Sequence, residues 1–177
     1  MSESFRVEVE VNGTRREATV EPRLTLADFL RDELALKGTH VACEHGFCGN
    51  CNVLLDGETV RSCLMFAVQA DGRSLTTVEG LAGDVGALGQ LQQAFHENGG
   101  LQCGFCTPAM LLTAHEYLEA HPDGGTDEEI REAINGVLCR CTGYQHIVDS
   151  IRSAAGGRDG VTAQAPTPEL VRQESQA

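Results

Sequence analysis

The sequence has no tryptophan, and aromatic residues make up only 5% of its 177 residues. Aromatic side chains contribute heavily to many protein cores, so we do not expect aromatic packing to be the main source of stability. No run approaches the ~20 apolar residues of a membrane span, and the first residues lack the basic and apolar regions of a signal peptide. We therefore expect no membrane span and a cytoplasmic location.

Basic residues are also scarce, with 13 Lys and Arg against 26 Asp and Glu, for a net charge of −13. No basic stripe or cluster interrupts this acidic background, so binding to nucleic acid or to an anionic membrane surface is not expected. The charge favours solubility and association with cationic patches, and it carries no information about the fold.

The first half of the chain has the pattern of a small mixed sheet crossed by one helix. Apolar and polar residues alternate from Phe5 to Val11, and the Asn12-Gly13 pair that follows is a strong hairpin signal. Thr25 is placed to cap a short helix, with Asp28 in a position similar to that of a capping box. The expected strands are residues 5–11, 14–20, 52–55, 58–60, 65–68 and 74–78.

The second half has the pattern of four short helices, which suggests a bundle. The first contains Leu88 to Phe95 and ends at Gly99-Gly100. The second has Thr107 as its expected N-cap, followed by Pro108 at the first helical position, and ends before His121-Pro122. Thr126 and Glu129 form a predicted capping box for the third, and Ile147 to Ile151 mark the fourth.

These patterns predict an α+β protein with two domains, residues 1–79 and residues 87–157. The glycine-rich stretch 80–86 is the expected linker, and it lacks the G-x-G-x-x-G pattern of a dinucleotide-binding turn. Residues 158–177 have no periodicity and are expected to be a flexible tail. An arm that becomes ordered on a partner subunit is the alternative for this segment.

Eight cysteines form two sets of four. The first set has the spacing C-x4-C-x2-C with a fourth cysteine eleven residues later, which is the spacing of a plant-type [2Fe–2S] ferredoxin. Gly46 and Gly49 lie inside this loop, where they permit the backbone to approach a cluster. The expected ligands are Cys43, Cys48, Cys51 and Cys63.

The second set consists of a C-x2-C pair and, thirty-two residues later, a C-x-C pair. Each pair precedes a predicted helix, whose N-terminal N–H groups and partial positive charge favour an anionic cluster. Alone this spacing is weak evidence, but downstream of a plant-type motif it predicts a second [2Fe–2S] cluster. The expected ligands are Cys103, Cys106, Cys139 and Cys141.

Structural zinc is the main competing interpretation of the cysteines. Zinc sites usually combine two C-x2–4-C pairs, and the first set contains only one such pair plus an additional cysteine upstream. Disulfides are less consistent with a reducing compartment. His45 lies inside the first loop, but four cysteines already fill the ligand positions there, so we expect it to pack within the loop or to be exposed to solvent.

Three motifs resemble the small iron–sulfur subunit of the xanthine oxidase family of molybdenum hydroxylases, as found in carbon monoxide dehydrogenase. They occur in the family's order and spacing, and the resemblance extends over residues 5–155. The segments that carry it are CEHGFCGNC at 43–51 with VLLDG at 53–57 and RSCL at 61–64, QCGFCTP at 102–108, and CRCTGY at 139–144.

The resemblance implies a ferredoxin-like β-grasp domain followed by a four-helix bundle, with one [2Fe–2S] cluster in each. It also implies a heterotrimer, often doubled, with a large molybdopterin-binding subunit and a medium FAD-binding subunit. Electrons from substrate oxidation at molybdenum would then pass through the helical-domain cluster and the ferredoxin-like cluster to FAD. By the same resemblance, Gln102 contacts the pterin cofactor and Cys139 lies close to it.

Two other functions remain open from the residues alone. One is a free-standing two-cluster carrier or redox sensor, which would purify without larger partner chains. The other is an interaction module held together by zinc, which would be colourless. The substrate and the terminal electron acceptor are not encoded in this chain.

Overall fold

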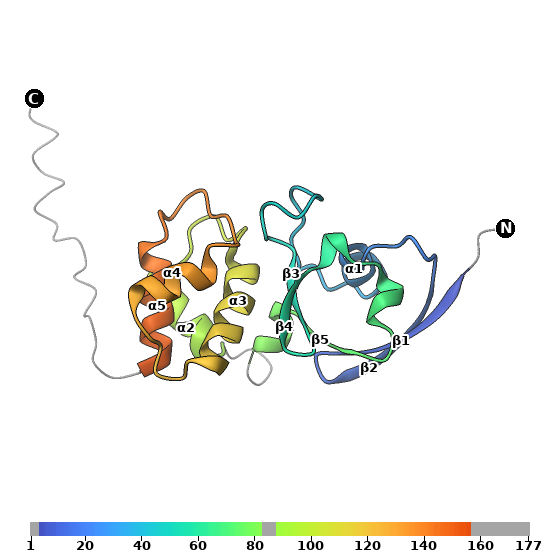
Figure 1. Ribbon diagram of the computed structural model, residues 1–177, viewed down its shortest axis with the longest axis horizontal. Helices are drawn as coiled ribbons and strands as arrows, with labels where there is room; N and C mark the ends of the chain where they lie inside the picture. Colours follow the sequence, from blue (N-terminus) through green and yellow to red (C-terminus); the bar gives the residue numbers. More distant parts are fainter. Residues whose placement is uncertain (1–3, 83–87, 157–177) are drawn as a thin grey trace, which may run out of the picture.

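The computed structural model describes residues 4–82 and 88–156 of the chain. A sheet-containing half and a helical half lie side by side, each with its own hydrophobic core (Figure 1). The predicted α+β class is therefore confirmed. None of the described helices is both long and apolar enough to cross a membrane.

The sheet begins with the predicted hairpin. Strands β1 (Phe5–Val11) and β2 (Thr14–Val20) pair antiparallel along their whole length, from Phe5 opposite Val20 to Val11 opposite Thr14. Asn12 and Gly13 connect them with φ values of 52° and 72°. Both residues tolerate this left-handed backbone, which matches the twist of the paired strands.

Three shorter strands complete a five-stranded sheet in the order β2-β1-β5-β3-β4. Strands β3 (Asn52–Leu55) and β4 (Glu58–Arg61) form the second predicted hairpin, and β5 (Ser74–Thr76) lies between β1 and β3. Strand β5 runs parallel to β1 and antiparallel to β3, so the sheet is mixed.

The first helical segment of the chain packs against this sheet. Thr25 caps helix α1 (Leu26–Asp28) by accepting a hydrogen bond from the backbone N–H of Asp28, as predicted. The helix continues as a wider turn, η1 (Phe29–Glu33), and the segment buries Leu26, Phe29 and Leu30 against the valines of β1.

The predicted strand at residues 65–68 is wrong. The segment instead contributes a single bridge between Thr25 and Phe66 and then forms the 3-10 helix η3 (Ala67–Ala70). The N–H of Leu26 bonds to the carbonyl of Met65, so this segment pairs with the start of α1 rather than with the sheet. The next predicted strand, 74–78, ends at Thr76, and Val78 already belongs to the 3-10 helix η4 (Val78–Leu81).

Four α-helices form the second half: α2 (Gln90–Glu97), α3 (Thr107–Ala120), α4 (Asp127–Ile134) and α5 (Gln145–Gly156). The capping box of Thr126 and Glu129 is present at the start of α4. At α3, however, the N-cap is Cys106 rather than Thr107, and Pro108 lies in the first helical turn. The buried residues of this half include Phe95, Met110, Ile130, Ile134 and Ile147.

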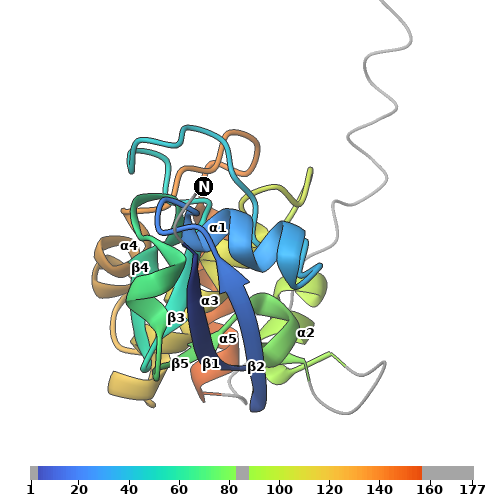
Figure 2. The same ribbon diagram turned by 90° about the vertical axis from the view of Figure 1, so that its right-hand side faces the viewer.

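Helix α3 faces the sheet and links the two halves (Figure 2). Its Thr113 accepts a hydrogen bond from the amide of Asn52 on β3 at 3.1 Å. Its Glu116 accepts another from the backbone N–H of Thr59 on β4, also at 3.1 Å. Residues 83–86 of the expected linker and the whole expected tail, 158–177, lie outside the described residues, as do residues 87 and 157 at the two ends of the expected helical domain.

Candidate iron–sulfur sites

The loops that carry the eight cysteines lie on one side of the molecule. The loop between η1 and β3, the loop before α3 and the loop before α5 all stand at the top of Figures 1 and 2. Cys63 joins the first loop from η2 (Ser62–Leu64), directly after β4. The fold therefore brings together cysteines that are widely separated in the sequence.

The first quartet is gathered by a loop with several left-handed residues. Glu44, Gly46 and Gly49 have φ values of 56°, 79° and 72°, which turn the chain back on itself. The backbone N–H of Cys48 then points at the sulfur of Cys43, with 3.4 Å between N and Sγ. Backbone N–H groups aimed at sulfur stabilise thiolates and the sulfides of an anionic cluster.

The second quartet joins two loops of the helical half. The sulfurs of Cys103 and Cys141 lie 3.2 Å apart, and Cys139 and Cys106 are also in hydrogen-bond contact. The hydroxyl of Thr142 lies 3.0 Å from the sulfur of Cys139. Cys103 and Cys141 are exposed whereas Cys106 is buried, so this quartet is accessible from solvent at Cys103 and Cys141.

The thiols of each quartet differ in how readily they ionise. Hydrogen bonds from the backbone of Cys48 and His45 lower the pKa of Cys43 to about 6. Burial raises the pKa of Cys63 to about 11 and that of Cys106 to about 12, and neighbouring cysteine sulfurs contribute to the rise in both pKa values. Hydrogen bonding to Phe105 lowers the pKa of Cys103. Four neighbouring thiols repel one another when they are all ionised, so a full set of thiolates requires a compensating positive charge, such as that of bound iron.

This donor set fits a binuclear cluster better than a single ion. The thiols approach in pairs, and each iron of a [2Fe–2S] cluster takes two thiolates. The pairs in contact are Cys43 with Cys48, Cys51 with Cys63, Cys103 with Cys141, and Cys106 with Cys139.

The two cysteine loops touch each other through their backbones. The N–H of Leu138 donates to the carbonyl of Cys48 at 2.8 Å, so a residue adjacent to Cys139 is bonded directly to Cys48. A Cβ atom on Gly49 would lie only 2.1 Å from the carbonyl oxygen of Gly136. Only glycine permits this approach, and the Gly49–Gly136 contact is one that the cysteine spacing did not reveal.

Gln102 and His45, which the sequence analysis also considered, both lie at the surface. Gln102 is exposed next to exposed Cys103, where it is free to meet a partner. His45 is exposed, contacts the carbonyl of Cys43 and stacks on Phe47, in line with both roles expected for it. His40, which the sequence did not single out, contacts the carbonyl of Phe105 at 2.7 Å and thereby joins the two halves.

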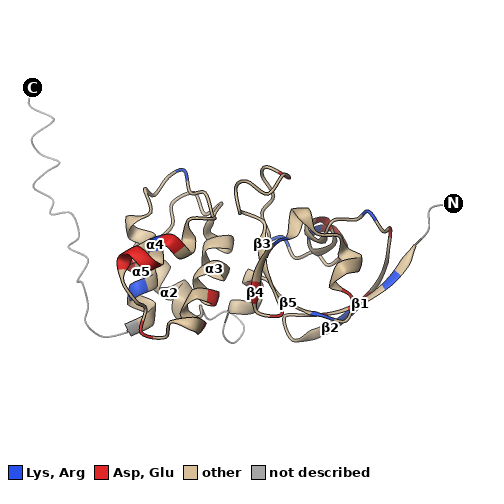
Figure 3. Cartoon of the chain, viewed as in Figure 1, with Lys and Arg blue, Asp and Glu red and all other residues tan. Residues whose placement is uncertain are grey.

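Charged side chains are not concentrated on the cysteine loops. Acidic residues occupy the first turn of α4, where they complement the helix dipole (Figure 3). The aromatic and aliphatic side chains near the loops are strongly exposed instead. Phe47 is 70% exposed and Leu64 59%, beside the first quartet, and Phe105 is 42% exposed beside the second. Such exposed apolar groups around a site are typical of a surface that meets another protein.

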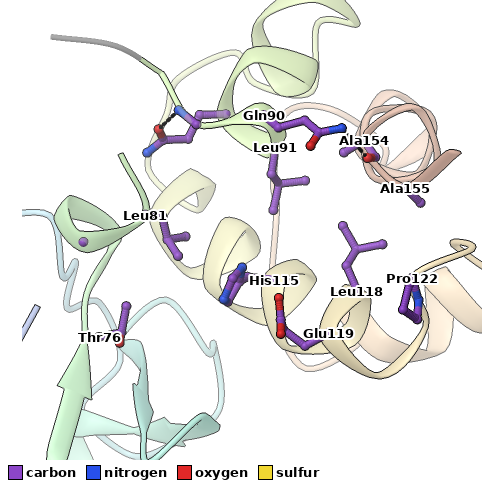
Figure 4. Close-up of a pocket in the computed structure, with 13 residues that line it drawn as sticks. Thr76, Leu81, Gln90, Leu91, His115, Leu118, Glu119, Pro122, Ala154 and Ala155 are labelled. Carbon is purple, nitrogen blue, oxygen red and sulfur yellow. Dashed lines mark hydrogen bonds between the residues drawn. The ribbon is translucent and has the colours of Figure 1, made fainter. Parts of the chain in front are cut away.

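A cavity of about 620 Å³ lies away from the cysteine loops, between η4, α2, α3 and α5 (Figure 4). His115 and Glu119 of α3 contribute to its lining together with Leu91 and Leu118. None of the eight cysteines contributes to it, so this cavity is separate from the candidate cluster sites.

Comparison with known proteins places both halves in iron–sulfur families. Residues 9–81 match the family described as "2Fe-2S iron-sulfur cluster binding domain", and residues 77–152 match "[2Fe-2S] binding domain". The chain is 55% identical to the caffeine dehydrogenase subunit gamma of Pseudomonas sp. (strain CBB1), over 97% of each chain. The chain belongs to the small iron–sulfur subunits of the xanthine oxidase family of molybdenum hydroxylases.

Further members of this family support the assignment. The nicotine 6-hydroxylase small subunit of Paenarthrobacter nicotinovorans is 53% identical over 88% of this chain and 92% of its own length. Among solved structures, a chain of quinoline 2-oxidoreductase from Pseudomonas putida 86 superposes with a TM-score of 0.84 at 47% identity, covering 88% of this chain and 95% of that one. The predicted ferredoxin-like and helical architecture is confirmed. As its relatives are, the chain is a [2Fe–2S] electron-transfer subunit of a multi-subunit oxidoreductase.

Proposed function

We propose that this chain relays electrons from a molybdopterin centre in a large subunit to FAD in a medium subunit. In this proposal the helical-domain cluster receives the electrons first and the ferredoxin-like cluster passes them on. Substrate oxidation releases two electrons, and a [2Fe–2S] cluster accepts one at a time, so two clusters in series suit a relay to a two-electron flavin.

We further propose that the ligands are the two quartets described above, carried by domains 1–79 and 87–157. When bound, each cluster supplies a one-electron carrier. The chain's own residues hold the sulfurs, direct backbone N–H groups at them and exclude water from Cys48, Cys51 and Cys106, which are at most 7% exposed.

The observation that carries the proposal is the backbone contact between the two cysteine loops. Because Leu138 donates its N–H to the carbonyl of Cys48, the two quartets are joined by one hydrogen bond and short stretches of covalent chain. A redox sensor or a zinc module has no need for two sites so directly connected.

The exposed surface supports the direction of the relay. Cys103, Cys141 and Gln102 are exposed on the helical half, which suits contact with a large subunit that holds the pterin cofactor. Phe47 and Leu64 are exposed beside the first quartet, which suits contact with a second, flavin-containing subunit. We propose a heterotrimer as the basic assembly.

We also propose that the complete enzyme oxidises a nitrogen heterocycle. Two relatives with the higher identities are named for caffeine and nicotine, at 55% and 53%, and a matching structure at 47% identity is named for quinoline. The aldehyde oxidoreductase subunit PaoA of Escherichia coli is 38% identical. Turnover of purine, pyridine and quinoline compounds, compared with aldehydes, tests this substrate class.

Rapid-reaction spectroscopy on the purified complex tests the relay and its order. Cys103→Ser removes a ligand of the helical-domain cluster, and we expect substrate then to reduce neither the remaining cluster nor the flavin quickly. Cys63→Ser removes a ligand of the other cluster, and we expect substrate still to reduce the helical-domain cluster while flavin reduction slows.

The opposite pattern, with the ferredoxin-like cluster reduced normally in the Cys103→Ser complex, would contradict the proposed order. Co-purification separates the relay from a free-standing carrier, because only a subunit brings a molybdenum-containing chain and a flavin-containing chain with it. Iron and sulfide analysis separates it from a zinc module.

A further inference from the structure

Arg61 occupies a bridging position between the two cysteine loops. It ends β4, two residues before Cys63, and each of its three guanidinium nitrogens donates a hydrogen bond to a different oxygen. Nε donates to the carbonyl of Gly46 at 2.8 Å, inside the first loop. One terminal nitrogen donates to the carbonyl of Gly136 at 2.9 Å, in the segment that leads to Cys139.

The third bond extends the bridge to helix α3. The other terminal nitrogen of Arg61 donates to the side-chain oxygen of Asn52 at 2.6 Å. The amide nitrogen of Asn52 in turn donates to the hydroxyl of Thr113 at 3.1 Å. Thr113 lies on the helix that begins directly after Cys106, so this chain of bonds reaches the second quartet by a separate route.

The chemistry of the network makes Arg61 difficult to replace. A guanidinium presents five donors in a fixed plane, so it can bind three carbonyl oxygens in three directions at once. Asn52 is 2% exposed, and its amide has one orientation that satisfies both neighbours, with oxygen toward Arg61 and nitrogen toward Thr113. Buried polar networks that are fully satisfied hold their surroundings rigid.

The bonds from Arg61 reach both loops within two residues of the contact through which the loops meet. Gly46 precedes Cys48 in the first loop, and Gly136 precedes Leu138 in the second. One side chain therefore binds both of the loops that the Leu138–Cys48 hydrogen bond joins. The two loops have no regular secondary structure. Without Arg61, only their own backbone contact would join them directly.

We propose that Arg61 is a positioning residue for electron transfer, which holds the two cluster loops at a fixed separation through Gly46, Gly136 and the Asn52–Thr113 pair. This inference rests on the proposed relay. Arg61 itself carries no electron, and it acts by keeping the loops in contact. Because tunnelling between two centres falls steeply with distance, a small separation of the loops slows transfer without removing either cluster.

The test compares the intact complex with an Arg61→Met variant, which retains the length of the side chain and removes its donors. In the chemically reduced complex we expect weaker magnetic splitting between the two cluster signals. We expect flavin reduction by substrate to slow several-fold, because tunnelling between the clusters weakens as the two loops move apart. Iron and sulfide content should match the wild type.

Arg31→Met is the matched control. Arg31 also donates to two backbone carbonyls, those of Lys37 and Thr39, but both lie in the same half of the molecule. We expect this variant to keep wild-type splitting and flavin reduction. Equal effects of the two substitutions would show that any lost arginine loosens the protein, and the proposal would be overturned.

A second pair of variants avoids the neighbourhood of the ligands. Thr113→Val removes the hydroxyl that Asn52 binds, and we expect a smaller loss of splitting in the same direction. Thr113→Ser keeps the hydroxyl and should restore the wild-type value. Wild-type splitting and flavin reduction in fully loaded Arg61→Met and Thr113→Val complexes would overturn the positioning role. A wild-type complex whose flavin is not reduced through the clusters would instead refute the relay itself.

Discussion

The phenolic oxygen of Tyr144 accepts a hydrogen bond from the backbone N–H of Cys139, with 2.9 Å between the two atoms. The same hydroxyl lies 3.4 Å from the carbonyl of Val137 and donates to it. Tyr144 also has a φ of 69°, a left-handed conformation that is uncommon for an aromatic residue. The Tyr144 side chain therefore stabilises the loop that carries Cys139 by bonding to the backbone at Cys139 and Val137.

Tyr144→Phe should weaken this loop. The substitution keeps the ring and leaves the N–H of Cys139 without its partner, which costs about 1–3 kcal/mol when the group is shielded from water. We expect the helical-domain cluster to be lost at a lower urea concentration than in the wild type, as followed by its visible absorbance. The ferredoxin-like cluster serves as the internal control, and its equal destabilisation would contradict a local role.

Gly49→Ala should disrupt the contact between the cysteine loops. The new Cβ would lie 2.1 Å from the carbonyl oxygen of Gly136, and the φ of 72° at this position already disfavours alanine. Left-handed backbone costs about 1–2 kcal/mol for a residue with a Cβ, and overpacking adds roughly 1–3 kcal/mol. We expect reduced cluster loading or a clearly lower melting temperature.

Gly57→Ala provides the comparison for Gly49→Ala. Gly57 has a φ of 89°, but a Cβ atom at this position would meet no other atom within 4 Å, so only the backbone cost applies. The substitution should lower stability by about 1–2 kcal/mol and leave both clusters loaded. A Gly57→Ala protein as impaired as Gly49→Ala would mean that backbone strain, and not the contact with Gly136, explains the result.

Substitution of single ligands should remove one cluster at a time. Cys51→Ser and Cys106→Ser lie in different quartets, each at a buried position. Each variant should fall from about four irons per chain to about two. Paramagnetic resonance of the reduced complexes should show a different signal missing in each. Loss of both signals from either variant would indicate that the quartets do not bind independently.

The capping box of α4 predicts a pH dependence. The backbone N–H of Thr126 lowers the pKa of Glu129 below its ordinary value, because the bond favours the charged carboxylate. A carboxyl with a depressed folded-state pKa stabilises the protein above its unfolded pKa, and this stabilisation is lost as pH falls through the folded value. Glu129→Gln should therefore be less stable than the wild type at neutral pH.

The stability difference should stay constant between about pH 8 and pH 6 and narrow only in the acid range where carboxylates protonate. Gln keeps an acceptor at this position, so the difference reports the charge. Unfolding midpoints of both proteins across this range provide the measurement. A difference that already narrows at neutral pH would show that the Glu129 carboxylate is not its source.

Local chemistry explains why much of this protein could be predicted from its sequence. Asn12-Gly13 specifies a tight hairpin because both residues accept a left-handed backbone, and Thr126 with Glu129 specifies a helix start because they bond to nearby N–H groups. The cysteine spacing indicates two clusters for a similar reason, since each short motif must wrap around a cluster of fixed size. The strand predicted at 65–68 failed because the N–H of Leu26 captures the carbonyl of Met65, a partner far away in the sequence.

Only the tertiary structure decided how the two quartets meet. No spacing rule connects Gly49 with Gly136, Leu138 with Cys48, or Arg61 with either loop. These contacts depend on α3 packing against β3 and β4, which sets the loops of one half beside those of the other. A sequence pattern records neighbours along the chain, whereas the distance between two electron carriers is set by contacts between segments that only the fold brings together.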